Sequence, residues 1–217
     1  MNLNSSIDFL KALSLNNNKV WMDENKNWYQ QERTRILNFT SELLKGLTEE
    51  DQDFSLLQAK DCLFRINRDV RFSKDKSPYK TNFGIALSPG GKKSGRAGYY
   101  VHISENNSFI GGGIWMPDAK VLNDIRQEID YNWDEFKAII DTQKFKKNFH
   151  FDGEKLLRPP KGYDASNPAI DFLKYKSFTV FKSISLQALE SDDLVQTSLE
   201  AFKDMKHFIQ FLNRVFD

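Results

Sequence analysis

The sequence predicts a single α+β domain, with a central antiparallel sheet flanked by N-terminal and C-terminal helices. Two observations support this class. Apolar residues recur at helical spacing before residue 50 and after residue 117, whereas the region between them alternates apolar and polar residues as strands do. Helices and strands that are segregated along a chain are typical of α+β proteins. With 217 residues, 40% of them hydrophobic, the chain can bury one sizeable core, so we expect one domain over residues 1–217.

Two helices are expected before the sheet. Apolar positions in residues 5–15 follow helical spacing, and Ser5 or Ser6 is expected to cap that helix. A longer helix is predicted over residues 19–47, with Gly46 and the acidic residues after it marking its end.

The middle of the chain predicts the strands. Alternation predicts strands at residues 62–67, 82–87, 98–104 and 108–115, with a loop at residues 73–78. In the third of these, Tyr99 and its alternate neighbours are expected to face away from Tyr100 and His102. Three consecutive glycines, Gly111–Gly113, indicate a close approach by another backbone, an aromatic ring or a ligand.

Helices dominate again after residue 117. Pro117 and Asp118 are expected to open one helix, and a second is predicted over residues 133–145. Residues 149–162 are expected to be irregular, followed by a short helix from Asn167 and a last strand at residues 175–183. A C-terminal helix is expected after a cap at Ser191.

The segment from Leu63 to Thr81 is the most informative part of the sequence. It contains six cations that alternate with apolar residues, which we expect to anchor it: Arg65, Arg68, Arg71, Lys74, Lys76 and Lys80 are interleaved with Phe64, Ile66, Val70 and Phe72. Arginine forms bidentate contacts with phosphate or carboxylate, and lysine adds point charge. We therefore predict an anion site here, with Tyr79 as a neutral donor. The alternative is a solvated hairpin whose arginines pair with Asp69 and Asp75.

Two further positions are candidates for the same site. Gly112 would allow a ligand to lie close to the sheet, although a bend that accommodates a Phe ring explains the glycines equally well. Arg158, in the Pro-Pro connector, could close over the ligand, or it could belong to a structural turn.

Candidates for proton transfer are few. His102, Tyr79 and Tyr100 are the candidate catalytic residues, and His102 would act as a general base if its face of the sheet lines a pocket. A hydrogen-bonded histidine without a catalytic role is the simpler interpretation. The histidines are far apart, and metal-ligand spacings are missing from the sequence, so we expect no metal and no cofactor. The single cysteine, Cys62, is expected to be buried and inert.

Charge distribution restricts the partners. The net charge is +1, but residues 64–98 hold nine Lys or Arg and only two Asp, so a basic region stands on an otherwise acidic protein. The absence of an apolar run of about 20 residues argues against a membrane span. One cysteine fits a reducing compartment, and we expect a cytoplasmic location.

Several motifs together resemble a known family. They are Arg68–Thr81, Gly98-Tyr99-Tyr100 and the run from Gly111 to Pro117. On these residues the chain resembles the uncharacterised family called domain of unknown function 2461, conserved hypothetical proteins of bacteria and fungi. The resemblance extends over nearly the whole chain. It implies a soluble single-domain protein and brings no activity, cofactor or catalytic residue with it.

Three functions remain open at this point. The protein binds an anionic small molecule or a nucleic-acid end at the basic segment; or it is an enzyme acting on an anionic substrate; or it docks an acidic protein partner. A concave basic site favours the first, a titratable group within hydrogen-bond reach of the arginines is required by the second, and a flat patch favours the third.

Overall fold

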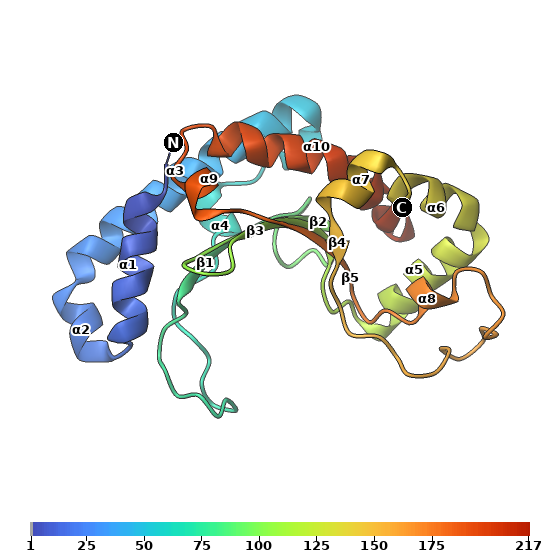
Figure 1. Cartoon of the computed structure of the whole chain (residues 1–217), viewed down its shortest axis with the longest axis horizontal. Coiled ribbons are helices and arrows are strands. Elements are labelled where there is room, and N and C mark those ends of the chain that lie inside the picture. Colours follow the sequence, from blue (N-terminus) through green and yellow to red (C-terminus); the bar gives the residue numbers. More distant parts are fainter. Residues whose placement is uncertain (1) are drawn as a thin grey trace.

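The computed structural model describes residues 2–217 and confirms the α+β class (Figure 1). Within this part of the chain, a five-stranded antiparallel sheet has the order β1-β2-β3-β5-β4. The strands are β1 (Asn82–Leu87), β2 (Gly98–Ser104), β3 (Phe109–Ile114), β4 (His150–Phe151) and β5 (Phe178–Ser183). The strands β1 and β4 therefore form the two edges.

The helices lie before, between and after the strands. They are α1 (Asn4–Leu15), α2 (Lys19–Glu24), α3 (Lys26–Glu50), α4 (Ala59–Cys62), α5 (Ala119–Tyr131), α6 (Trp133–Ile140), α7 (Gln143–Asn148), α8 (Ile170–Leu173), α9 (Leu186–Leu189) and α10 (Leu194–Asn213), with short 3₁₀ turns at Gln52–Phe54 and Arg214–Phe216. No helix in residues 2–217 is long and apolar enough to cross a membrane.

One face of the sheet is covered and the other is open. The long helices α3 and α10 lie above the sheet, and no helix is drawn across its lower face (Figure 1). Tyr99 of β2 stacks on Phe202 of α10 with ring centroids 4.6 Å apart. On either side of the open face the chain extends downward, as the basic segment at one edge and as residues 152–169 at the other (Figure 1). We call the uncovered side the open face.

The predicted strands β1 and β2 are confirmed, including the alternation in β2. Tyr99, Val101 and Ile103 are buried beneath the helices, whereas Tyr100 and His102 are only partly buried on the open face. Because every second residue of a strand points to the same side, this alternation fixes which residues a ligand on the open face would meet.

The strand predicted over residues 62–67 is wrong. Cys62 ends the short helix α4, and the residues after it make only isolated bridges, Leu63 with Ile85 and Asn67 with Tyr79. Conversely, β4 lies inside the stretch expected to be irregular. It is only two residues long and is held by pairing with β5, which its own sequence does not announce.

The long helix predicted over residues 19–47 is two helices, α2 and α3, separated at Asn25. Gly46 does not end α3, which continues to Glu50. A Cβ at Gly46 would lie 2.4 Å from Leu199 Cδ1, so the glycine lets α10 approach closely instead. Packing between helices therefore explains a residue that the sequence indicated as a terminator.

Several predicted helix caps also differ. Ser5 and Ser6 lie within α1, where their hydroxyls donate to the carboxylate of Glu32 at 2.5 and 2.8 Å. Asp118, expected within the first turn, is the N-cap of α5 and accepts a hydrogen bond from Val121 N at 2.9 Å, which leaves Pro117 before the helix.

The remaining C-terminal elements are shorter than expected. The helix predicted over residues 133–145 is divided into α6 and α7, because the Thr142 hydroxyl caps a new helix. The short helix expected from Asn167 begins at Ile170, and β5 begins at Phe178. The C-terminal helix is confirmed as α10, but Ser191 is not its cap: the N-cap is Asp193, whose backbone N–H donates to the Ser191 hydroxyl at 3.1 Å.

Candidate functional site

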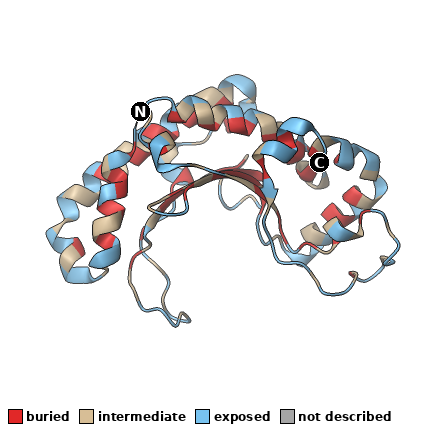
Figure 2. Ribbon diagram, in the orientation of Figure 1, coloured by how far each residue is buried: buried red, intermediate tan, exposed pale blue. Residues whose placement is uncertain are grey.

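Residues 63–81 form a two-stranded arm that extends from the outer edge of β1. Backbone hydrogen bonds join Phe64 N to Gly84 O (2.9 Å), Lys80 N to Ile66 O (2.8 Å) and Arg68 N to Pro78 O (2.9 Å). We call residues 63–66 and 79–81 the arm root, and residues 67–78 the arm tip. The arm is largely exposed (Figure 2), but its root is part of the same hydrogen-bonded surface as the sheet.

The arm root is firmly anchored. Ile66 and Tyr79 are buried, and the side chain of Asn17 accepts from Tyr79 N (3.1 Å) and donates to Tyr79 O (2.9 Å). The expectation that alternating apolar residues anchor the segment therefore holds for Ile66 but not for Phe72, which is 96% exposed at the arm tip.

The cations of the arm tip are mostly paired within the tip. Arg71 forms an ion pair with Asp69 (2.6 Å), and Arg68 forms one with Asp75. Lys76 donates to the carbonyl oxygen of Val70 at 3.0 Å. The arginine pairing expected under the alternative interpretation is thus present.

Hydrogen bonds also set the acidity of the two tip carboxylates. Hydrogen bonds from Arg71 lower the pKa of Asp69 below its ordinary value. Hydrogen bonds from Ser77, followed by that from Arg68, hold the pKa of Asp75 well below its usual range. Both carboxylates therefore stay ionised at neutral pH and neutralise the arginines next to them.

The cations of the arm root differ, because none of them forms an ion pair within residues 2–217. The ammonium of Lys80 lies 5.4 Å from the centroid of the Phe64 ring, and that of Lys92 lies 5.1 Å from it. Lys92 comes from the loop between β1 and β2 and donates to the carbonyl oxygen of Leu63 at 2.7 Å. Arg65 is exposed beside them. We call Arg65, Lys80 and Lys92 the root cluster.

The root cluster carries positive charge that no ion pair within residues 2–217 neutralises. Burial, followed by repulsion from Arg65 and Lys92, lowers the pKa of Lys80. Burial lowers the pKa of Lys92 as well, although Cys62 and Asp61 act in the opposite direction from beyond ion-pair distance. Cations held together in this way would be stabilised by an anion placed between them.

The open face next to the root cluster is aromatic. His102 stacks on Phe109 with ring centroids 4.9 Å apart and planes 4° from parallel. Tyr100 lies 5.8 Å from Phe109 and 6.3 Å from Phe64. Since Lys80 and Lys92 contact the Phe64 ring, these two lysines lie on the same side of the sheet as Tyr100 and His102.

Two of the three candidate catalytic residues have free polar atoms there. His102 and Tyr100 make no side-chain hydrogen bond within residues 2–217, and no buried side-chain nitrogen or oxygen in this range lacks a partner, so their polar atoms reach solvent. Burial lowers the pKa of His102 and raises that of Tyr100. Both groups are consequently neutral at pH 7.

Tyr79 is placed differently from these two. It is buried, and the charge that acts on its pKa, after burial itself, is that of Asp23 in α2. Its ring therefore lies toward the N-terminal helices, and its part in the site is to hold the root through its backbone.

Gly112 and Arg158 are not brought to the root cluster. Gly112 faces the covered side, where an added Cβ would lie 3.1 Å from Ile209 Cδ1 and 3.2 Å from Met205 Sδ. Close helix packing is thus the physical reason for this glycine, as it is for Gly46. Arg158 belongs to the segment after β4, at the opposite edge of the sheet from the arm (Figure 1).

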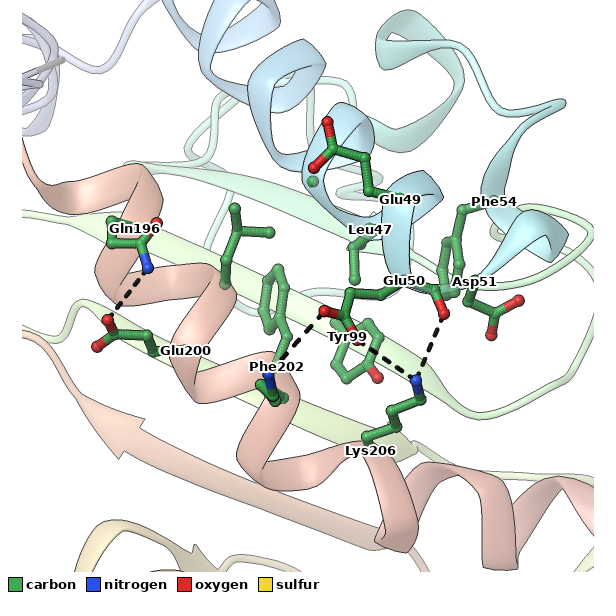
Figure 3. Close-up of a pocket in the computed structure, with 13 residues that line it drawn as sticks. Leu47, Glu49, Glu50, Asp51, Phe54, Tyr99, Gln196, Glu200, Phe202 and Lys206 are labelled. Atoms are coloured by element: carbon green, nitrogen blue, oxygen red, sulfur yellow. Dashed lines mark hydrogen bonds and ion pairs between the residues drawn. The ribbon is translucent and has the colours of Figure 1, made fainter.

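A hollow of about 210 Å³ lies on the covered side, between the end of α3 and α10 (Figure 3). Its rim is acidic, with Glu49, Glu50 and Glu200, and Lys206 pairs with Glu50 at 3.6 Å. Burial raises the pKa of Tyr99 beneath it. This hollow is a seam between helices whose charges do not suit an anion.

Sequence reasoning missed three residues of the site, namely Lys92, Phe109 and Phe181. Lys92 falls within the basic region of residues 64–98, but it belongs to a different loop from the arm, and its position in the sequence does not predict that it reaches the arm root. The two phenylalanines reach the open face only through the register of β3 and β5. The alternation of side chains between the two faces of each strand is the signal that could place these phenylalanines, but the three glycines of β3 weaken it.

The fold and site define an α+β protein with a basic arm beside an open aromatic sheet face. The chain belongs to the family of conserved hypothetical proteins DUF2461, whose model matches residues 5–211. Comparisons with curated proteins and with solved structures find no match. Within residues 2–217, no three His, Cys, Asp or Glu side chains form a group that could hold a metal ion.

Proposed function

We propose that the protein binds an anionic, phosphate- or carboxylate-bearing ligand at the arm root. The observation that supports this proposal most strongly is the root cluster, in which the ammonium groups of Lys80 and Lys92 lie over the Phe64 ring and Arg65 is near enough to repel Lys80, without an acidic partner at ion-pair distance. Phosphates and carboxylates form charge-assisted hydrogen bonds with such groups. The arm-tip cations Arg68, Arg71, Lys74 and Lys76 outnumber the two carboxylates of residues 67–78, so the tip keeps a net charge of +2 and assists by attracting the anion.

The root is better prepared for binding than the tip. Its backbone is fixed by the two hydrogen bonds between the Asn17 side chain and the backbone of Tyr79, and by hydrogen bonds to β1. Binding at the root therefore needs little ordering of the chain. At the tip, an incoming anion has to compete with Asp69 and Asp75 for Arg71 and Arg68.

A thermal-shift series tests the proposal. Phosphate, pyrophosphate, nucleotides and dicarboxylates are added at low salt to the wild type, to the double variant Arg65→Gln/Lys80→Gln and to Lys137→Gln, an exposed lysine of α6 that serves as a matched control. A ligand that raises the melting temperature of the wild type and the control, but not of the double variant, supports a root site. A rise that is equal in all three proteins refutes it.

An enzyme acting on an anionic substrate is the second candidate. The observation that favours it is the pair of unbonded polar groups, His102 and Tyr100, on the face that the root cluster borders. A neutral imidazole can accept a proton, and the cations would stabilise developing negative charge. If a ligand identified above is converted by the wild type, His102→Gln should abolish turnover while the ligand still raises the melting temperature.

Docking to an acidic protein is the third candidate, favoured by Phe72. This ring is 96% exposed at the arm tip, with the Arg71 guanidinium 5.8 Å from its centroid. An exposed aromatic residue beside arginine is a common anchor in protein interfaces. Phe72→Ser would weaken such a complex and leave binding of small anions unchanged.

A further inference from the structure

The open face carries a continuous row of aromatic rings that starts at the root cluster. Phe64 contacts Tyr100 (6.3 Å between centroids), Tyr100 contacts Phe109 (5.8 Å), Phe109 contacts Phe181 (5.9 Å), and Phe181 contacts His150 (6.1 Å). The five residues come from the arm root, β2, β3, β5 and β4, so the row crosses the whole sheet. We call it the aromatic row.

Glycines leave space around these rings. A Cβ at Gly84 of β1 would lie 2.4 Å from the Tyr100 hydroxyl oxygen, so only glycine lets the Tyr100 ring lie over this strand. Gly111 pairs with both Tyr100 and Phe181 in the sheet register and separates them without a side chain of its own. Tyr100, Phe109 and Phe181 are half-buried rather than sealed.

The aromatic row and the root cluster together indicate the chemistry of the ligand that the open face would bind. Rings that are partly open to solvent on a sheet stack planar groups, and the root cluster at one end requires negative charge. A small anion would leave the rings unused, and a neutral sugar would leave the cations unused. Nucleic acid supplies both phosphates and planar bases, and its bases are accessible for stacking only in single strands.

The length of the row favours several nucleotides over one. Neighbouring strands lie about 4.8 Å apart, and the row runs from the arm across all five strands, so it spans roughly 24 Å. Comparable sheets that bind RNA through aromatic residues stack two or three bases. We infer that the open face binds single-stranded RNA or DNA, with bases stacked on the aromatic row and the backbone held by the root cluster; this inference rests on the proposed anion site.

His102 and Tyr100 would then meet base edges. Their polar atoms are unbonded within residues 2–217, and His102 lies flat on Phe109. A neutral imidazole offers one donor and one acceptor to a base, and the Tyr100 hydroxyl offers both from one atom. Stacking gives affinity with little dependence on sequence, and these two groups would add a modest base preference.

The test measures binding of a fluorescent twelve-nucleotide oligo(dT) to the wild type, to Phe109→Leu/Phe181→Leu and to Tyr131→Leu, an exposed tyrosine of α5 used as the control. Leucine keeps the apolar character and removes the aromatic face. The double variant should bind at least about tenfold more weakly than the wild type, whereas the control should bind equally. A duplex of the same length should bind more weakly than the single strand.

The possible outcomes distinguish failure of the nucleic-acid inference from failure of the anion site on which it rests. If the double variant binds the oligonucleotide as tightly as the wild type, or if the duplex binds equally well, the bases do not stack on the row and only the anion site remains. If pyrophosphate binds at the arm root and oligo(dT) does not bind at all, the inference fails while the proposed function stands. If neither oligo(dT) nor any anion of the thermal-shift series binds, both fail.

Two further measurements protect the test from a variant that misfolds or associates. In the wild type, oligo(dT) should shift the ring proton signals of His102 and His150, and unchanged signals on saturation would overturn the inference. Sedimentation of the free protein gives the remaining check: a dimer that Phe109→Leu/Phe181→Leu converts to a monomer would assign the open face to a second copy of the chain instead.

Discussion

Replacing Lys80 with glutamine separates the stability of the arm root from its ability to bind. The substitution removes one cation of the root cluster and keeps a polar side chain of similar length. Two effects on stability oppose each other. The contact between the Lys80 ammonium and the Phe64 ring, at 5.4 Å, is lost, and such contacts contribute about 0.5–1 kcal/mol at exposed sites.

The opposing effect is the relief of unfavourable charge. Burial and the neighbours Arg65 and Lys92 all lower the pKa of Lys80, which means that the folded protein disfavours its charged form. Removing the charge removes that penalty. We therefore expect the free energy of unfolding to change by less than about 1 kcal/mol.

Binding should respond much more strongly than stability. A hydrogen bond to a charged group contributes about 1.5–3 kcal/mol, so Lys80→Gln should raise the Kd for an anionic ligand roughly 10- to 150-fold. Lys80→Arg keeps the charge and should recover most of the affinity. Lys137→Gln should change neither quantity, because this lysine is exposed on α6, outside the arm.

The assay combines urea unfolding with calorimetric titration of the best ligand from the thermal-shift series. Unchanged affinity in Lys80→Gln would refute the assignment of the site to the root cluster. A loss of several kcal/mol in unfolding free energy would show instead that the lysine is a structural residue whose charge the fold requires.

Three other predictions test the structure around the site. Gly113→Ala should destabilise the protein severely, because Gly113 has φ of 124° and a Cβ there would lie 1.9 Å from Phe178 O; thermal unfolding measures this, and a normal melting temperature would contradict the strand register. Cys62 should react very slowly with a thiol reagent at pH 8 in the folded state, since burial raises its pKa to about 11, and rapid labelling would contradict its position. The ion pairs of the arm tip should persist into acid: the folded pKa values of Asp69 and Asp75 are depressed, so their contribution to stability is complete above the unfolded pKa of about 3.9 and declines as pH falls from there towards the folded values. The side-chain carboxyl signals of Asp69 and Asp75 should therefore titrate below the ordinary aspartate range, and titration of both at or above about pH 3.9 would refute the pairing.

Much of the fold is predictable from local patterns in the sequence. Strand β2 has the expected bounds and faces because its alternation of large apolar and polar side chains has one strong period. Helix α10 is equally evident from its apolar spacing. In both cases burial against the core and the local pattern indicate the same structure.

The errors occur where distant contacts override local signals. Gly46 lies inside α3 because Leu199 of α10 needs the space, and nothing near Gly46 in the sequence reveals that neighbour. Ser5 and Ser6 resemble caps, but their hydroxyls donate hydrogen bonds to the carboxylate of Glu32 on another helix, a side chain that is only 2% exposed. The strand expected over residues 62–67 is reduced to isolated bridges, because the chain leaves the sheet to form the arm.

The candidate site, too, is predictable from the sequence where it depends on local residues and not where it depends on distant contacts. The basic character of residues 65–80 is visible in the sequence, and so is the alternative that Asp69 and Asp75 neutralise its arginines. Which cations remain unpaired is decided by geometry, since Lys92 joins the arm root from a separate loop. The aromatic row depends on the register of four strands and the arm, which no single segment encodes.

The most direct test of the account is to map pyrophosphate binding residue by residue, using backbone amide signals of the labelled wild type. A root site predicts that the largest shifts on titration lie at Phe64, Lys80 and Gly84, where the arm joins β1, and that high salt reverses them. Shifts concentrated in residues 69–77, or an absence of shifts at low salt, would contradict the assignment of anion binding to the arm root.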